Sequence, residues 1–339
     1  MRRENLKAIF WSWLYPWKPQ TMILVIMLIT LPAWSYGKDT KPKSSINRLI
    51  SISLAYQDRV ADAALIVAIH KGFFEAEGLK LKKMRFSNGP ACSEALLLGN
   101  ADFGTMGDAT AIIAAARGAP IKIIASHGGG ERRHRIIVNK KSNVRIIADL
   151  EGKKLAIKKG TSTYGGLLIF AEKNKLNLSK VHIIDMRPID MVEAMLSGSV
   201  DAIVASEPTP SLIEFTSQGQ ELATLAGLGS NYPILLVVRS KFALKNPVGV
   251  HKVLKAIRKG AQYISENIDS SAEILSQVTG LPIKVAKKSM GYHYYRVVMD
   301  DKVIDSLKTT ASFLMRQGVI DKIPDLAKVI DKGYLCKIE

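Results

Sequence analysis

The strongest constraint on the fold is an alternation of short apolar strands with amphipathic helices, broken twice by glycine-rich segments. Such alternation predicts an α/β protein in which helices cover mostly parallel sheets. The expected strands are 46–55, 79–86, 103–106, 121–126, 135–139, 154–158, 181–185, 202–205 and 234–239. The expected helices are 61–70, 93–98, 109–117, one from about Thr163, one from about Asp190, and most of the chain beyond 239.

The two breaks are His127–Gly130 and Gly227–Pro233. They separate a central block of about a hundred residues from two flanking blocks. This spacing predicts two lobes joined by two hinge crossings, with a cleft between them. Residues 48–130 and 234–339 are expected to form lobe 1, and residues 131–233 lobe 2.

The N-terminus has the order of a secretory signal peptide. Four basic residues precede the apolar run Thr21–Leu31, which is too short to span a bilayer as a helix. We therefore expect residues 1–35 to be a signal peptide cleaved after Ser35, and residues 36–47 to be a polar leader. The alternative is an uncleaved segment that holds the protein on the membrane as a sensory module.

The chain is strongly basic, with 48 Lys and Arg against 30 Asp and Glu and a net charge of +18. Such a surplus suggests nucleic acid, a membrane surface or an anionic ligand as a partner. Because no nucleic-acid-binding motif accompanies it, we expect no nucleic-acid partner. Two cysteines exclude a disulfide-framework fold and leave open a Cys92–Cys336 pair.

No motif of a hydrolase, a metalloprotease, a nucleotide-binding loop or a redox pair occurs. The six histidines lack metal-ligand spacing, and each is expected on the surface or in packing. We therefore expect no enzymatic activity, no cofactor and no metal.

Candidate ligand contacts in lobe 1 follow its strands, because ligands of open α/β sheets bind beyond the carboxyl ends of strands. Asp108 is either the N-cap of its helix or a neighbour of an anion bound to the free N–H groups there. The candidates are Tyr56, Gln57, Asp58, Asn88, Gly89, Gly107, Asp108 and Ala109.

The candidates in lobe 2 centre on a turn with several hydroxyl groups, which open a helix and suit an oxyanion or act as plain N-caps. Asp190 is either an N-cap or a contact, and Glu207 would accept from an amine if it faced the cleft. Since three acids oppose a simple anion, the charge of the cargo stays open. The candidates are Thr161, Ser162, Thr163, Tyr164, Asp190, Glu207 and Tyr232.

Five segments in order carry a resemblance to a known family. They are Ala68–Leu79 with its Gly-Phe-Phe, Ala95–Gly104, Ala148–Ala156 followed by Gly160–Thr163, Glu193–Ala202, and Glu207-Pro208. Together they resemble the periplasmic substrate-binding proteins of ABC importers for nitrate, taurine, alkanesulfonates and thiamine precursors, which have the type II periplasmic-binding-protein fold. In that family the turn corresponding to Gly160–Thr163 often holds a sulfonate or similar oxyanion.

The resemblance implies a monomeric, periplasmic solute-binding protein that closes on a small oxyanion or heterocycle and delivers it to an inner-membrane permease. The alternative is an enzyme on the same scaffold, similar to pyrimidine synthases or small-acid dehydratases.

Overall fold

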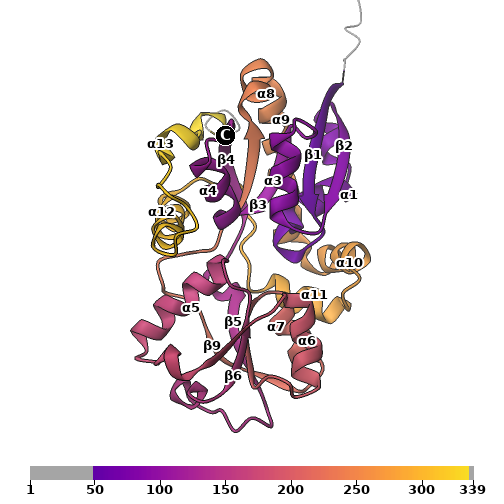
Figure 1. The fold of residues 1–339 in the computed structure, drawn as a ribbon. Helices are drawn as coiled ribbons and strands as arrows, with labels where there is room; N and C mark the ends of the chain where they lie inside the picture. The colour runs from indigo at the N-terminus through magenta and orange to yellow at the C-terminus, as the bar shows by residue number, and fades with distance from the viewer. Residues whose placement is uncertain (1–48, 336–339) are drawn as a thin grey trace, which may run out of the picture. The chain divides into compact units, whose positions relative to one another are not determined.

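Two five-stranded sheets organise residues 49–335, the part of the chain that this computed structural model describes (Figure 1). Helices flank both sheets, so the predicted α/β architecture is confirmed. The expectations for residues 1–47 and for Cys336 lie outside the described residues. The strands divide between the sheets as the two lobes would require, while the boundaries of the lobes stay a prediction.

The first sheet has the strand order β2-β1-β3-β10-β4. Its strands are β1 Ile50–Gln57, β2 Leu79–Phe86, β3 Phe103–Gly107, β4 Ile121–Gly128 and β10 Ile234–Arg239. The flanking helices are α1 Ala63–His70, α2 Phe73–Ala76, α3 Gly89–Leu97, α4 Asp108–Ala116, α8 Ser240–Lys245, α9 Pro247–Glu266, α10 Ile268–Thr279, α11 Ile283–Met290, α12 Asp301–Arg316 and α13 Leu326–Val329.

The second sheet has the strand order β7-β6-β8-β5-β9. Its strands are β5 His134–Asn139, β6 Lys154–Ile157, β7 His182–Asp185, β8 Ala202–Ser206 and β9 Gly219–Thr224. Helix α5, Ser162–Lys173, packs on one face. Helices α6, Pro188–Leu196, and α7, Thr209–Phe215, pack on the other.

Each sheet has one strand that runs against the rest. Strand β10 is antiparallel to both β3 and β4, and β5 is antiparallel to both β8 and β9. Each reversed strand is the first one after the chain passes from one sheet to the other. The expectation of mostly parallel sheets therefore holds for the remaining strands. The sequence reading missed β9, whose polar residues do not alternate with apolar ones.

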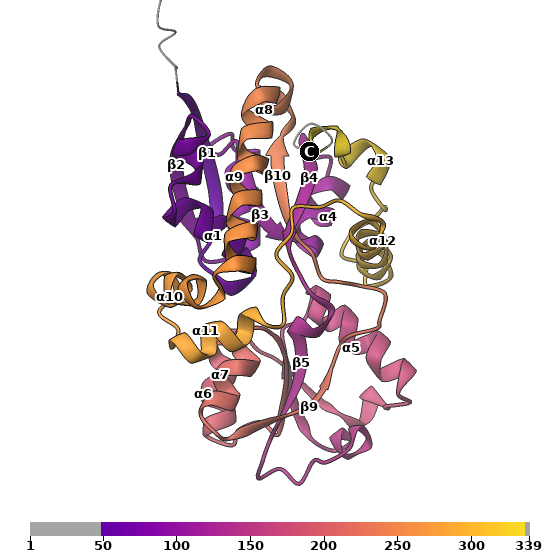
Figure 2. The same ribbon diagram turned by 180° about the vertical axis from the view of Figure 1, so that it is seen from behind.

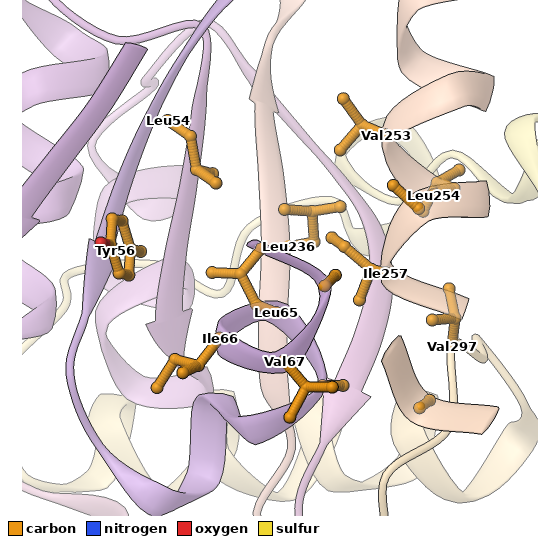
Figure 3. Packing of buried hydrophobic residues seen from close by; sticks show 14 of the residues in the cluster. Leu54, Tyr56, Leu65, Ile66, Val67, Leu236, Val253, Leu254, Ile257 and Val297 are labelled. Carbon is orange, nitrogen blue, oxygen red and sulfur yellow. The ribbon is translucent and has the colours of Figure 1, made fainter. Parts of the chain in front are cut away.

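Alternate residues of β1 pack on opposite faces of the first sheet. Leu54 and Tyr56 of β1 pack with α1 and α9 on one face, while Ala55 packs with α3 and α12 on the other. Helix α9 presents its buried residues at helical spacing, among them Val253, Leu254 and Ile257 (Figure 3). Burying each such side chain contributes about 1.5–3 kcal/mol to stability.

Three chain segments lie together where the sheets meet. The first crossing, residues 129–133, joins β4 to β5, and the second crossing, residues 225–233, joins β9 to β10. A third segment, residues 291–300, joins α11 to α12 (Figure 2). Gly129 exchanges two backbone hydrogen bonds with Tyr294, at 2.8 and 3.2 Å, and the Gly130 N–H donates to the Asn231 carbonyl at 2.7 Å.

Gly130 is required at this junction for two reasons. Its φ of +152° is rarely adopted by residues with a side chain, and a Cβ would lie 2.4 Å from the Tyr292 carbonyl oxygen. The glycine-rich break therefore serves close packing of the first crossing against the third segment.

None of the helices in residues 49–335 combines the length and the apolar character needed to cross a bilayer.

The contact between α1 and α9 gives a testable prediction. A Cβ on Gly260 of α9 would lie 2.1 Å from the Ala64 carbonyl oxygen, so Gly260→Ala must separate the two helices. We expect a loss of about 1–3 kcal/mol or more in the free energy of unfolding, measured by urea denaturation. Gly249→Ala on the same helix is the matched control, because its Cβ would meet Ile50 at an ordinary 3.4 Å. Equal stability of the two variants would contradict the packing described.

Candidate functional site

Buried polar residues gather around the two crossings and the third segment. We call them the buried polar cluster. The Coulombic effects among their side chains show that they are neighbours, as given below. Its members are Arg59 and Asp62 after β1, His127 in β4, Arg133 at the end of the first crossing, His134 at the start of β5, and His293 in the third segment.

Arg133 is a buried cation that forms no salt bridge with the described residues. It is 6% exposed, and its Nε donates to the Tyr232 carbonyl oxygen at 3.2 Å. Within residues 49–335, no carboxylate lies within 4.0 Å of its guanidinium nitrogens, and no hydrogen-bond partner meets its two terminal nitrogens. Burial lowers the pKa of Arg133 to about 10, helped by Arg59 and opposed by Asp108. Burying an unpaired charge is costly, so this arrangement favours a site for an anion.

Several other nitrogen atoms of the cluster are buried without a partner among the described residues. They belong to the turn after β1, to β4, to β5 and to the third segment. These atoms are Nη2 of Arg59, Nε2 of His134, Nε2 of His293 and both ring nitrogens of His127. Because buried polar groups in folded proteins are usually hydrogen-bonded, such a concentration indicates a ligand site.

His134 is held in a fixed orientation. Its Nδ1 lies 2.7 Å from Thr163 Oγ1, and its ring stacks on Tyr232 with centroids 3.9 Å apart. Burial lowers the pKa of His134 well below its ordinary value, and Arg133 and His293 lower it further. The imidazole is therefore neutral near pH 7, and its buried Nε2 has no partner among the described residues.

On the side of the first sheet, Asp62 joins Arg59 to His127. Arg59 Nε donates to Asp62, and His127 Nε2 lies 3.5 Å from the other oxygen of that carboxylate. Burial lowers the pKa of His127 to about 4. Asp62 therefore compensates Arg59, while the charge of Arg133 stays uncompensated.

The expected contacts Tyr56, Gln57 and Asp58 have protein partners. Tyr56 is buried in the core, and Gln57 Nε2 donates to the Thr105 carbonyl oxygen at 3.3 Å. Asp58 pairs with Arg85 at 2.9 Å. Burial raises the pKa of Asp58, while Arg85 lowers it.

The next expected loops form helix N-termini. Asn88 caps α3 by accepting from the Ala91 N–H at 3.0 Å, and Gly89 opens the helix. Gly107 is the N-cap of α4, so the N-cap interpretation of Asp108 is wrong. The Ala109 N–H donates to Asp108 at 2.9 Å.

Asp108 is instead a buried bridge between helices. Ser162 of α5 donates to its Oδ1 at 2.5 Å, and Thr310 of α12 donates to its Oδ2 at 2.7 Å. The hydroxyl groups of Ser162 and Thr310 therefore donate to Asp108 and not to a bound anion. A cavity of about 20 Å³ lies beside this bridge, lined in part by Gly166 and Tyr232.

The three hydroxyl residues of the turn before and at the start of α5 have different partners. Thr161 is the N-cap of α5 and accepts from the Tyr164 N–H at 3.3 Å. Ser162 bonds Asp108 and Thr163 bonds His134, so both lie close to the buried polar cluster. Tyr164 meets Phe313 edge-on, with ring centroids 6.4 Å apart.

Asp190 and Glu207 also have protein partners. Asp190 is exposed and pairs with Arg187, and the N-cap expectation is wrong because α6 already begins at Pro188. Glu207 is 4% exposed and pairs with Arg135 at 2.7 Å. Glu207 is therefore not free to accept from an amine-bearing cargo.

Arg135 is the centre of a second buried network. It pairs with Glu207, Glu214 and Glu221 at 2.7, 2.7 and 2.5 Å. The Tyr292 ring lies 4.3 Å from its guanidinium carbon. Burial lowers the pKa of Arg135, but hydrogen bonds to Glu207 and Glu214 outweigh it, and the net direction is upward. This arginine is saturated by carboxylates, in contrast to Arg133.

The sequence reading missed the buried polar cluster. Of the expected contacts, Asp108, Ser162, Thr163 and Tyr232 lie beside it, through the bonds given above. His127, His134 and His293 were expected on the surface or in packing, but each has a buried nitrogen without a described partner. The available signal was the run Arg132–Arg135 directly after the glycine-rich break.

Comparison with known proteins identifies the family. Residues 61–270 match the model of the family described as NMT1/THI5 like. The chain belongs to this family. A putative aliphatic sulfonates-binding protein of Bacillus subtilis is 30% identical over 278 residues, which are 80% of this chain and 84% of the relative.

Solved structures of other proteins share the fold. The alkanesulfonate-binding protein SsuA of Xanthomonas axonopodis, bound to MOPS, is 25% identical with a TM-score of 0.72, covering 83% of this chain and 98% of that one. The desulfurization enzyme DSZB is 14% identical with a TM-score of 0.68, covering 85% and 98%, and shows the fold alone. The predicted family and the predicted role of a solute-binding protein are confirmed.

Within residues 49–335, no group of three or more His, Cys, Asp or Glu is placed to hold a metal ion.

The contrast between the two arginine networks gives a prediction. Arg135→Met leaves three carboxylates without their shared partner, and we expect a loss of about 3–5 kcal/mol in the free energy of unfolding. Arg187→Met is the control, since the exposed Arg187–Asp190 pair contributes at most about 1 kcal/mol. Urea denaturation at pH 7 measures both. A similar small loss in the two variants would show that the Arg135 network is not structural.

Proposed function

We propose that this protein captures a small organic oxyanion, with an alkanesulfonate as the favoured class, and delivers it to the permease of an ABC importer. The observation that carries the proposal is Arg133, a buried guanidinium without a carboxylate partner in the described chain. A sulfonate would supply the missing negative charge. Its oxygen atoms suit the planar donors of a guanidinium, which form paired charge-assisted hydrogen bonds.

The acids that left the sign of the cargo open are already engaged. Asp108 accepts from Ser162 and Thr310, and Glu207 pairs with Arg135. Arg133 is therefore the charge available to a ligand, which favours an anion over an amine or an uncharged heterocycle. The names of the sulfonate-binding relatives support the same class.

The positions of these residues support a mechanism in which the two sheets close on the ligand. Arg59 lies in the turn after β1 of the first sheet, His134 opens the second sheet, and Arg133 lies on the crossing between them. An anion held by all three would contact both sheets at once. Such contacts exist only when the sheets are close, so the ligand favours the closed arrangement.

No observation favours the alternative of an enzyme. Cys92 is buried, and burial raises the pKa of its thiol to about 12, so it is not a thiolate at neutral pH. We propose binding without chemistry, by a monomer in the periplasm.

The test is isothermal titration of the protein with ethanesulfonate. Arg133→Met should weaken binding about 100-fold or more, as expected when one member of a buried charge pair is removed. Its folding stability should be unchanged or higher, because an unpaired buried charge is lost.

Arg132→Met is the matched control, since Arg132 is the exposed neighbour of Arg133, and it should keep the wild-type affinity. Wild-type affinity in Arg133→Met would refute the proposed function.

A further inference from the structure

His293 carries an inference about how the proposed site holds its anion. This residue lies in the third segment, where its neighbours Tyr292 and Tyr294 contact the glycines of the first crossing. Its ring stacks on Tyr295, with centroids 5.8 Å apart at an angle of 11°. The contacts of its neighbours with the first crossing and the stacking on Tyr295 therefore hold the imidazole in place.

One hydrogen bond determines which nitrogen of His293 carries the proton. Nδ1 lies 2.8 Å from the carbonyl oxygen of Ser289. A carbonyl oxygen only accepts, so Nδ1 must be the N–H donor. In the neutral ring Nε2 then presents a lone pair, and this atom is buried without a partner in the described chain.

The surroundings of His293 keep it neutral in the free protein. Burial, Arg133 and Arg59 together lower its pKa to about 3, against the hydrogen bond to Ser289, which raises it. The titratable and charged groups around the buried polar cluster come from every segment that meets there. They are Arg59, Asp62, Asp108, His127, Arg133, His134, Glu207, Tyr232, Tyr294 and Tyr295.

We propose that His293 is a ligand residue that binds the anion most tightly in its protonated form, so that below the pKa of His293 in the complex the capture of the cargo takes up one proton from solvent. The proposal rests on the proposed function, because it requires an anion at Arg133. In the reaction, neutral His293, one solvent proton and the free anion combine into a pair of imidazolium and anion. No covalent bond of the cargo changes.

The chemistry of an oxyanion explains why the proton is needed. An oxygen of a sulfonate facing the bare Nε2 would place two lone pairs against each other. A proton on Nε2 converts this repulsion into a charge-assisted hydrogen bond. The anion also offsets the positive charge of Arg133 and Arg59, which removes part of the cause of the low pKa.

His134 does not impose the same requirement. Its Nδ1 faces the hydroxyl of Thr163, which donates or accepts equally well. If Thr163 donates, the neutral ring carries its proton on Nε2 and offers it to the anion directly. His293 lacks this option because its partner is a carbonyl.

The sign of the pH dependence follows by linkage. The pKa of His293 is about 3 in the free protein and higher in the complex. Above the pKa of the complex, affinity for the anion does not depend on pH. Between the two pKa values affinity rises about tenfold for each unit by which pH falls, because one proton binds with each anion.

The test is isothermal titration of the full chain with ethanesulfonate between pH 4.5 and 8, in pairs of buffers that differ in ionisation enthalpy. A sulfonate is an anion throughout this range, so any pH dependence belongs to the protein. We expect tighter binding as pH falls, by up to about tenfold per unit, and uptake approaching one proton per anion.

His293→Gln should remove both the proton uptake and the pH dependence, since an amide donates at the position of Nε2 without titrating. His293→Asn, whose amide nitrogen stands in for Nδ1, is the second variant if the first is unstable. His182→Gln, at an exposed position of β7, is the control and should behave as the wild type.

Two results would overturn the inference while leaving the proposed function intact. They are binding without pH dependence or proton uptake, and proton uptake that persists unchanged in both His293 variants. Absence of ethanesulfonate binding at every pH would overturn the proposed function, and this inference with it.

Discussion

Arg133, a buried guanidinium that pairs with no carboxylate in residues 49–335, is the constraint on which the proposed site depends. A guanidinium withdrawn from water normally has a carboxylate beside it, as Arg135 has three. The two arginines are separated by one residue of β5, yet one is saturated and the other is not. This difference separates a structural cation from the one that we propose binds the ligand.

The surrounding fold holds that charge at the junction of the two sheets. Three segments of chain meet at the junction of the sheets, and backbone hydrogen bonds join them to one another. Gly130 allows the first crossing to approach Tyr292 more closely than a residue with a Cβ would permit. The junction is thus rigid in its contacts, while the sheets on either side carry separate cores. These backbone contacts hold Arg133 in place between the two sheets.

The sequence predicts much of this fold and less of the site. Strands such as Leu79–Phe86 and Ile234–Arg239 follow from apolar patterns that depend only on nearby residues. The strand Gly219–Thr224 is polar and forms by pairing with β5, which local pattern does not reveal. The sequence left Asp108 as either an N-cap or a neighbour of a bound anion. It is instead a bridge between helices, because Thr310, far along the chain, donates a hydrogen bond to it. The buried histidines were missed for the same reason, since long-range packing determines their burial.

The most direct test is a crystal structure of the protein with 2-bromoethanesulfonate, in which anomalous scattering locates the bromine and marks the bound molecule. We expect the sulfonate group against the Arg133 guanidinium, with Arg59 on one side and His134 and His293 on the other. A sulfonate bound elsewhere, with Arg133 still lacking any anionic partner, would contradict it.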